Sequence, residues 1–187
     1  NLLYENIFLK KIEFIHGDIR EKKKLKEQLN WADIVVWMAA IVGDGACDVN
    51  KEDTLVINQN CVKWLSNNFD GKIIFFSTCS VYGAQTGILD ENSQLNPLSL
   101  YAKTKLEAEK ILKNKNATIF RLGTLFGVGD TYSRLRMDLV VNILTMKAYF
   151  NKEITIFGGN QYRPLLHVKD VARAVKTVIK VNRNGIY

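Results

Sequence analysis

The sequence has few of the residues that bind metals or form disulfide bonds. It contains two histidines in 187 residues, His16 and His167, which are far apart in the chain. Its three cysteines, Cys47, Cys61 and Cys79, are odd in number and widely spaced, which argues against a disulfide framework and a paired zinc site. We therefore expect unbridged thiols and no bound metal.

Long apolar runs are also missing. No stretch of about 18 apolar residues, the length needed to span a membrane as a helix, occurs in the chain. The opening residues, NLLYENIFLKK, lack the basic start, the long apolar stretch and the small-residue cleavage site of a signal peptide. These absences predict a cytoplasmic protein without a membrane partner.

Acidic residues are outnumbered by basic ones, 19 to 26, which gives a net charge of +7. This charge favours an acidic partner, either a nucleic acid or a small molecule such as a nucleoside diphosphate. The densest basic run, residues 21–27, is flanked by acids and followed by Leu29, as on the solvated face of an amphipathic helix. Most aromatic residues lie within apolar runs and do not alternate with basic ones, so we expect no nucleic-acid partner.

Short apolar runs alternate with longer amphipathic ones, which is typical of parallel strands joined by crossover helices. The pattern predicts an α/β fold. The expected strands are residues 11–16, 34–38, 72–77, 118–122 and 154–157. The expected helices are residues 20–29, 54–67, 98–113, 138–149 and 168–179. Asn96 is expected to cap the third of these helices, with Pro97 in its first turn.

Tyr101 and Lys105 form the strongest chemical pattern in the sequence. Four residues apart on a helix, they share a face, where the ammonium would favour a tyrosinate and so give an acid or base that works near neutral pH. Thr78 ends an apolar strand, at the edge where sites of α/β proteins open, and its hydroxyl is expected to bond the same substrate oxygen. The alternative is a solvated tyrosine beside a lysine whose charge reaches water.

The motif YAKTK at 101–105 follows STCSVYG at 77–83, and together they resemble the extended short-chain dehydrogenase/reductase family. That family includes NAD-dependent nucleotide-sugar epimerases, dehydratases and reductases. The resemblance implies a Rossmann-like doubly wound parallel sheet, NAD as cofactor, and Tyr101, Lys105 and Thr78 as catalytic residues. It also implies that a nucleotide-diphosphate sugar is epimerised through a transient keto-sugar.

Other segments extend the resemblance over nearly the whole chain. FIHGDIR at 14–20 and DIVVWMAA at 33–40 resemble the third and fourth strands of the family, RLGT at 121–124 resembles the segment after the sixth, and RPLLHVKD at 163–170 resembles a segment whose arginine binds the diphosphate. The implied cofactor-binding residues are Asp18, Ile19, Ala39, Ala40, Asn58, Ser77, Tyr101, Lys105 and Leu122. The implied substrate-binding residues are Thr78, Thr124 and Arg163.

Structural alternatives stay open for three of these residues: a helix cap for Asp18, a buried structural amide for Asn58 and a surface charge for Arg163. We interpret His167 as structural.

The sequence departs from the family pattern in two places. Trp37 replaces a histidine, which we interpret as a packing change. Cys79 and Ser80 stand where 4,6-dehydratases carry the acid pair that eliminates water, so they favour an epimerase or a reductase over a dehydratase. A catalytically silent NAD-binding protein is a further alternative, disfavoured because the tyrosine, lysine and threonine occur together.

A glycine-rich phosphate loop is absent before the first expected strand, and the glycines at 127–129 and 158–159 are interpreted as turns. We therefore expect an N-terminally truncated fold, with a partial NAD-binding Rossmann domain at 1–150. Residues 151–187 would form a partial substrate-binding region with a returning Rossmann helix. In the strand order 3-2-1-4-5-6 the two absent strands lie between 11–16 and 34–38. The isolated chain is therefore expected to bind NAD weakly and to show no measurable turnover, unless another chain completes the sheet. A homodimer is a further possibility implied by the resemblance.

Overall fold

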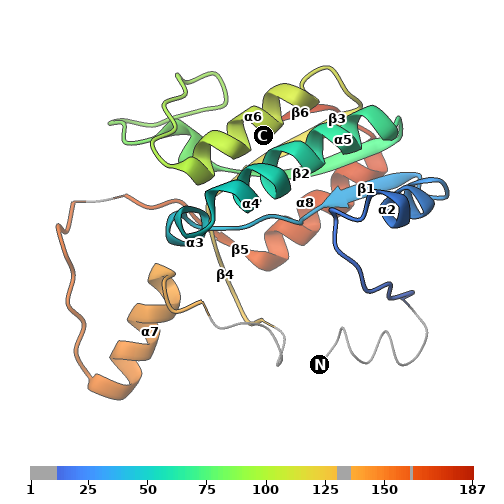
Figure 1. The fold of residues 1–187 in the computed structure, drawn as a ribbon. Helices are drawn as coiled ribbons and strands as arrows, with labels where there is room; N and C mark the ends of the chain where they lie inside the picture. Colours follow the sequence, from blue (N-terminus) through green and yellow to red (C-terminus); the bar gives the residue numbers. More distant parts are fainter. Residues whose placement is uncertain (1–11, 130–135, 161) are drawn as a thin grey trace. The chain divides into compact units, whose positions relative to one another are not determined.

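The computed structural model describes residues 12–129, 136–160 and 162–187 (Figure 1). The chain divides by its contacts into two compact units. The first, here called the sheet unit, comprises Gly17–Leu122 and Arg173–Tyr187, and the second unit comprises Asn1–His16 and Gly123–Ala172. The functional division expected near residue 150 is a separate matter and stays a prediction.

A four-stranded parallel sheet forms the centre of the sheet unit. Its order is β1-β2-β3-β6, and the strands span Ile34–Trp37, Lys72–Thr78, Ala117–Leu122 and Gly185–Ile186. Three strands match the expected ranges to within one residue at each end. The register pairs Ile34 with Lys72 and Phe75 with Ile119. The α/β class and the parallel sheet that the sequence predicts are therefore confirmed.

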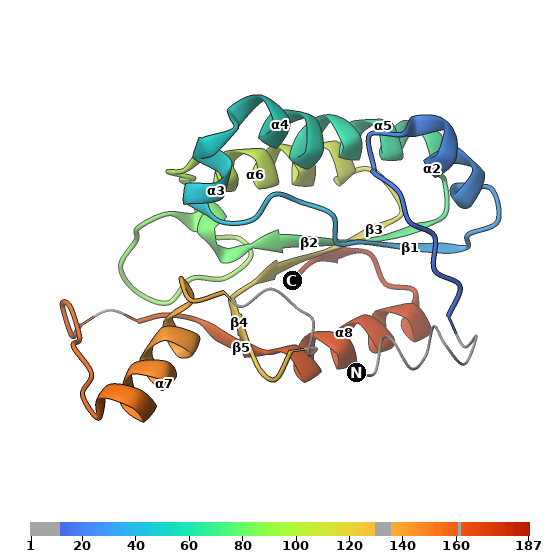
Figure 2. The same ribbon diagram turned by 60° about the horizontal axis from the view of Figure 1, so that its bottom comes forward.

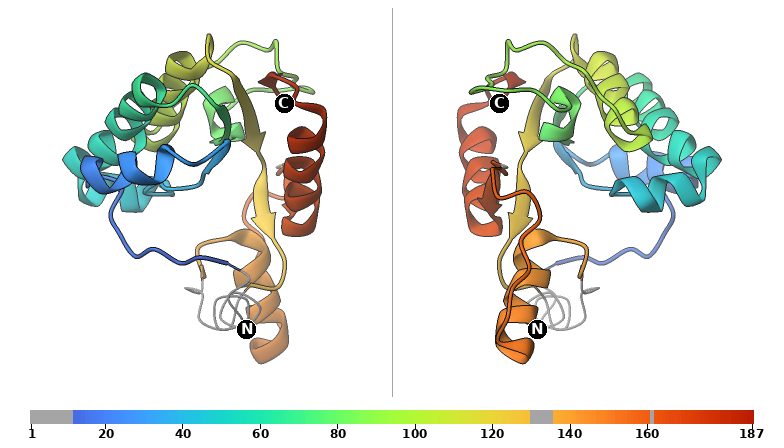
Figure 3. Two further views of the ribbon diagram at one scale, coloured as in Figure 1. Left: turned by 90° about the vertical axis from the view of Figure 1, so that its right-hand side faces the viewer. Right: turned by 90° about the vertical axis from the view of Figure 1, so that its left-hand side faces the viewer.

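Helices cover both faces of this sheet (Figures 2 and 3). On one face lie α2, α4, α5 and α6, and on the other lies the part of α8 that belongs to the sheet unit. The helical elements of the chain are α2 Lys22–Leu29, α3 Asp44–Val49, α4 Lys51–Leu55, the π-helical turn η1 Val56–Asn60, α5 Cys61–Asn68, the 3₁₀ turn η2 Cys79–Tyr82, α6 Leu100–Leu112, α7 Val140–Asn151 and α8 Val168–Val181.

The alternation of side chains along β2 explains why both faces are covered. Ile73 and Phe75 point into a core with α5 and α6, whereas Ile74 points into a smaller core with Val178 of α8. Because successive residues of a strand face opposite ways, a strand that is apolar at every position needs a helix layer on each side. The continuous apolar run IIFF within β2 thus dictates a three-layer arrangement.

The N-cap of helix α6 lies three residues after the expected one. Ser99 is the N-cap, and its hydroxyl accepts a hydrogen bond from the Ala102 amide at 3.2 Å. The expectation that Asn96 caps the helix is wrong, because the Asn96 amide instead donates to the Val81 carbonyl at 3.0 Å. That bond keeps Asn96 beside η2, so the helix starts only after Ser99. The Ser99 hydroxyl then accepts from one of the backbone amides in the first turn, which have no partner within the helix.

Two expected strands are not formed. Over residues 12–16 the chain runs without strand structure, and Phe14 is 62% exposed; residue 11 lies outside the described residues. Residues 154–157 also form no strand, and Phe157 is 81% exposed. A strand exists only where a neighbour completes its hydrogen-bonding ladder, and no such neighbour lies beside either segment in the described parts of the chain.

The second unit contains a pair of short parallel strands that the apolar pattern did not predict. They are β4 Thr124–Phe126 and β5 Leu165–His167, with Phe126 opposite His167. Gly123 allows this approach, since a side chain there would meet the Pro164 carbonyl oxygen at 2.7 Å. Three residues per strand are too few to show an alternating pattern in the sequence.

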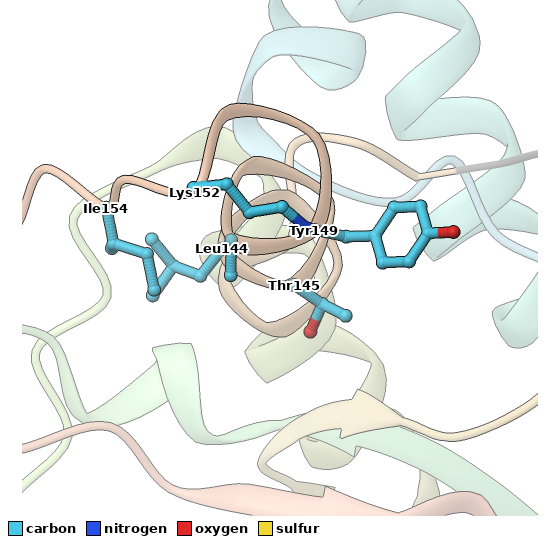
Figure 4. Close-up of a pocket in the computed structure, with 6 residues that line it drawn as sticks. Leu144, Thr145, Tyr149, Lys152 and Ile154 are labelled. Atoms are coloured by element: carbon cyan, nitrogen blue, oxygen red, sulfur yellow. The ribbon is translucent and has the colours of Figure 1, made fainter.

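Helix α7, the other element of the second unit, has no buried residue. A shallow open groove of about 530 Å³ runs along it, lined by Leu144, Thr145, Ala148, Tyr149, Lys152 and Ile154 (Figure 4). None of the predicted site residues lines this groove. Within the residues described, no helix is long and apolar enough to cross a membrane, and no group of metal-ligating side chains gathers.

Candidate active site

The carboxyl end of β2 carries Thr78, as the sequence predicts. Thr78 is buried and also caps the 3₁₀ turn η2: its hydroxyl oxygen accepts a hydrogen bond from the Ser80 amide at 3.1 Å. The hydroxyl donates in turn to Ser80 Oγ at 3.1 Å. These bonds fix the direction of the Thr78 side chain at the strand end.

Lys105 projects from α6 to the same end of β2. Its ammonium donates a hydrogen bond to the Phe76 carbonyl at 2.8 Å and lies 4.7 Å from the centre of the Phe75 ring. The residue is 4% exposed, so the alternative of a lysine whose charge reaches water is wrong. Burial lowers the pKa of Lys105 to about 8, although Cys47 and Glu109 act to raise it. Such a group changes charge close to neutral pH.

Tyr101 lies one turn before Lys105 on α6 and is partly buried. Its backbone carbonyl accepts a hydrogen bond from the Thr104 hydroxyl at 2.9 Å. The four-residue spacing puts the phenol and the ammonium on one face of the helix. The three predicted catalytic residues thus lie on two elements of the sheet unit, the end of β2 and the first turns of α6, which the bond from Lys105 to the Phe76 carbonyl joins.

The low pKa of Lys105 predicts a distinctive stability profile. Between pH 8 and 10.5 the unfolded chain keeps the lysine proton that the folded chain has lost, so stability rises with pH across this window. Lys105→Met is expected to remove this rise, which amounts to roughly 3 kcal/mol at about 1.36 kcal/mol per pKa unit. Urea denaturation at several pH values measures it, with exposed Lys103→Met on the same helix as control. Parallel profiles for the wild type and Lys105→Met would contradict the expectation.

Asn58 acts on the small-residue turn after β1 through its side chain. Its Oδ1 accepts from the Ile41 amide at 2.8 Å, and its Nδ2 donates to the Ile41 carbonyl at 2.9 Å and to Thr104 Oγ1 at 3.3 Å. Both amide protons are therefore donated within the protein, which favours the structural alternative for Asn58 over direct cofactor contact. The residue sits in the π-helical turn η1, which swings its side chain toward the turn at 39–41. Ala39 packs against the core there, and Ala40 is partly exposed.

Asp18 is held by Arg20 and does not cap a helix. The N-cap of α2 is Glu21, so the helix-cap alternative is wrong. The Arg20 guanidinium donates to Asp18 Oδ2 at 2.7 Å and to Asp53 Oδ1 at 3.0 Å, which ties the 18–20 turn to α4. The hydrogen bond from the Arg20 side chain is the main cause that lowers the pKa of Asp18 to about 2. Ile19 packs against the main core.

Ser77 and Leu122 face protein groups in the sheet unit. The Ser77 hydroxyl donates to a carboxylate oxygen of Glu109 in the core, and Leu122 packs against the smaller core under α8. The cofactor contacts predicted for Ser77 and Leu122 stay predictions.

The sequence analysis did not predict a buried ion pair that lies beside the site. The side chains of Arg121 on β3 and Glu109 on α6 are 4% and 3% exposed, and Arg121 Nη2 lies 2.7 Å from Glu109 Oε2. Burial works to lower the pKa of Arg121, but the hydrogen bonds with Glu109 and Tyr82 outweigh it and raise this pKa. A signal was present: Glu109 follows Lys105 by four residues and so shares its inward face, while Arg121 interrupts an apolar strand.

The two substrate-binding candidates of the second unit lie on β4 and before β5. The Thr124 amide donates to the Pro164 carbonyl at 2.8 Å, and Arg163 is exposed. His167 packs edge-on against Phe126 at 5.1 Å, and its Nδ1 accepts from the Lys169 amide at 3.1 Å. These contacts support the structural interpretation of His167.

A family model described as the NAD dependent epimerase/dehydratase family matches residues 4–187. The chain belongs to this family. The match spans both units, and it includes the strand end, the Tyr101 helix and the segment at 163–170. The resemblance inferred from the two central motifs is therefore confirmed as family membership.

Relatives of this chain include several sugar epimerases. A putative UDP-glucose 4-epimerase of Methanocaldococcus jannaschii is 32% identical over 185 residues, covering 88% of this chain and 58% of the relative. An N-acetyl-alpha-D-glucosaminyl-diphospho-ditrans,octacis-undecaprenol 4-epimerase of Escherichia coli O157:H7 is 29% identical over 178 residues, covering 88% and 50%. The crystal structure of a UDP-glucuronic acid 4-epimerase from Bacillus cereus with UDP-glucuronic acid and NAD superposes with a TM-score of 0.79 at 28% identity, covering 97% and 62%. The chain spans about half the length of the curated relatives it matches.

Proposed function

We propose that this polypeptide takes part in the NAD-dependent 4-epimerisation of a nucleotide-diphosphate sugar through a transient keto-sugar. The observation that carries the proposal is the buried ammonium of Lys105, with its pKa near 8, one turn after Tyr101 and beside the strand end that bears Thr78. An ammonium held in a low-dielectric site costs stability, and such a cost is typical of functional sites. The description of two relatives as 4-epimerases, one of them putative, supports carbon 4 as the reacting position.

The donor set of the sheet unit fits a dinucleotide. Lys105 has three ammonium protons, of which one goes to the Phe76 carbonyl, and the others suit ribose hydroxyls. Ala39 and Ala40, just before the Ile41 backbone that Asn58 holds, have short side chains that leave room for a cofactor. Asp18 and the backbone at Ile19 would hold the adenine end. NAD, when bound by these residues, would supply the hydride acceptor and donor for the sugar carbon.

The residues of the chain manage the proton and the oxygen. Tyr101, as tyrosinate, takes the proton from the sugar hydroxyl, and the ammonium of Lys105 stabilises the phenolate charge. Thr78 donates a hydrogen bond to the same oxygen, for which its proton turns away from Ser80 Oγ. On the return step Tyr101 gives the proton back, so the enzyme ends unchanged.

Sugar-nucleotide recognition is proposed for residues of the second unit. Arg163 suits the diphosphate because its planar, permanently charged guanidinium matches phosphate oxygens in pairs, and Thr124 would bond the sugar. In this proposal residues 1–150 mainly serve the cofactor and 151–187 the substrate. A cytoplasmic location and a homodimer stay predictions.

A dehydratase is the second candidate, and two residues disfavour it. Cys79 and Ser80 form the start of η2, directly after Thr78, and neither carries the carboxyl group needed to protonate a leaving hydroxyl. An elimination of water would therefore lack its acid at this position. A reductase would differ from the proposed enzyme in that NAD is not regenerated. A catalytically silent NAD-binding protein would convert no sugar.

The test is turnover of UDP-sugars by the full-length polypeptide that carries this chain. UDP-glucose, UDP-N-acetylglucosamine and UDP-glucuronic acid are incubated with catalytic NAD and followed by proton NMR. We expect one of them to give its 4-epimer without net consumption of NAD. A 4-keto-6-deoxy product would support the dehydratase, stoichiometric oxidation or reduction would support a redox enzyme, and no conversion would support the silent protein.

A further inference from the structure

Four side chains of the sheet unit form a network that the proposed chemistry does not use: Ser77, Glu109 and Arg121, whose side chains are buried, and Tyr82, which is partly buried. The Glu109 carboxylate accepts from Arg121 Nη2 at 2.7 Å and Nε at 3.1 Å, and it also accepts from the Ser77 hydroxyl. Arg121 Nη1 donates to the Tyr82 hydroxyl at 3.1 Å and to the Glu91 carbonyl at 3.1 Å. We call Ser77, Tyr82, Glu109 and Arg121 the ion-pair network.

The ion-pair network joins every part of the sheet unit that bears a proposed catalytic residue. Ser77 directly precedes Thr78 at the end of β2. Glu109 lies one turn after Lys105 on α6, and Tyr82 ends η2, the turn that Thr78 caps. Arg121 also holds the loop after η2 through the Glu91 carbonyl. A change at its centre therefore reaches both the strand end and the helix.

Stability alone is a poor explanation for such a pair. Taking both ions out of water costs about as much as their attraction returns, so apolar residues of similar size often serve a core equally well. The directional bonds of the guanidinium and the carboxylate do something that apolar residues cannot. These bonds fix the position of α6 on β2 and β3 and the rotation of α6 about its own axis.

We propose that Glu109 and Arg121 are positioning residues, which set Lys105 and Tyr101 on α6 against Thr78 on β2 and hold the loop from Gly83 to Leu98 at the Glu91 carbonyl. The catalytic meaning of this placement rests on the proposed function. The placement itself can be measured without turnover.

Lys105 reports on the ion-pair network directly. Its pKa is lowered by burial, while the two groups that act to raise it are Cys47 and Glu109. Replacing Glu109 by glutamine removes one of these influences and leaves the positive charge of Arg121 uncompensated nearby. Both effects act in the same direction, so the pKa of Lys105 is expected to fall below about 8.

The experiment is an NMR titration of this chain carrying lysine labelled with carbon-13 at Cε, with the Lys105 signal identified by its loss in Lys105→Arg. In Glu109→Gln we expect the Lys105 midpoint to move to lower pH. The matched control is Glu107→Gln, since Glu107 is exposed on the same helix and paired with Lys110 at 2.6 Å. That variant is expected to leave the midpoint in place. A folded Glu109→Gln protein with an unmoved Lys105 midpoint would overturn the proposal.

A milder variant keeps the proposal testable if Glu109→Gln does not fold. Glu109→Asp retains the charge but is too short to reach Ser77 and Arg121 together. We expect faster amide exchange at residues 79–98, by about fivefold for each hydrogen bond lost at ~1 kcal/mol, and no change for Glu107→Asp. Unchanged exchange in a folded Glu109→Asp protein would also overturn it.

These readouts separate the two proposals. If the Lys105 midpoint and the amide exchange respond as expected while no sugar is converted, the positioning role stands and the proposed function fails. If epimerisation is found but neither readout responds, the function stands and the ion-pair network is merely structural.

Discussion

Replacing Arg121 with methionine is expected to lower the free energy of unfolding by about 3–5 kcal/mol, because it leaves the Glu109 carboxylate charged, buried and without its main partner. Methionine fills a similar volume, so loss of packing adds little. Urea denaturation of the 187-residue chain at pH 7 measures the change. This is the largest stability effect that we expect from a single substitution away from the apolar core.

The double variant Glu109→Gln/Arg121→Met separates an unpaired charge from a lost pair. We expect it to be more stable than Arg121→Met alone, because no buried ion remains. The control is Lys110→Met, which breaks the exposed pair with Glu107 and is expected to change stability by no more than about 0.5 kcal/mol. Equal losses for Arg121→Met and Lys110→Met would mean that the buried pair contributes nothing.

Tyr101→Phe is expected to reduce the epimerisation rate of the full-length polypeptide by about 10²- to 10⁴-fold, the usual contribution of a positioned acid or base. Only one hydroxyl is removed, so the fold and the affinity for the nucleotide sugar are expected to be kept. Progress curves followed by NMR give the rate, and competition with UDP gives the affinity.

Tyr149→Phe is the matched control for this substitution. Tyr149 is 68% exposed on α7 and lies in the second unit, among none of the proposed site residues. Its variant is expected to turn over at the wild-type rate. If Tyr101→Phe retained more than about a tenth of the activity, the phenol would not be the acid and base of the reaction.

Strand β2 is the strand whose burial made it easiest to predict. Its central residues IIFF are apolar, it is buried at nearly every position and it is covered on both faces, so its pattern leaves little choice. The segment at residues 12–16 is also rich in apolar residues, yet it forms no strand. Strand formation depends on a partner elsewhere in the fold, which the local pattern does not contain.

The start of α6 shows the same dependence at a smaller scale. Asn96 and Ser99 are both good capping residues, and the choice between them is made by the bond from the Asn96 amide to Val81. Capping preferences in the sequence locate the helix start to within a few residues. The contact between Asn96 and Val81 decides which residue is the N-cap.

Within the site, helical spacing predicted which residues share a face of a helix. It did not predict the hydrogen-bond partners of their side chains. Lys105 proved buried and bonded to the Phe76 carbonyl near the end of β2, while its pairing with Tyr101 stays a prediction. Asn58 and Ser77, in contrast, use their side chains on Ile41 and Glu109. Hydrogen-bond partners of this kind are set by tertiary packing between elements distant in sequence, and one sequence does not reveal them.

The most direct measurement uses UDP-glucose deuterated at carbon 4, incubated with NAD and the full-length polypeptide that carries this chain. Proton NMR then reports both the configuration at carbon 4 and the isotope attached to it. The proposed mechanism predicts an inverted product that keeps its deuterium, with Tyr101→Phe giving almost none of it. Inversion accompanied by loss of deuterium to water, or a sugar left uninverted while the wild-type protein binds both NAD and UDP-glucose, would contradict the mechanism.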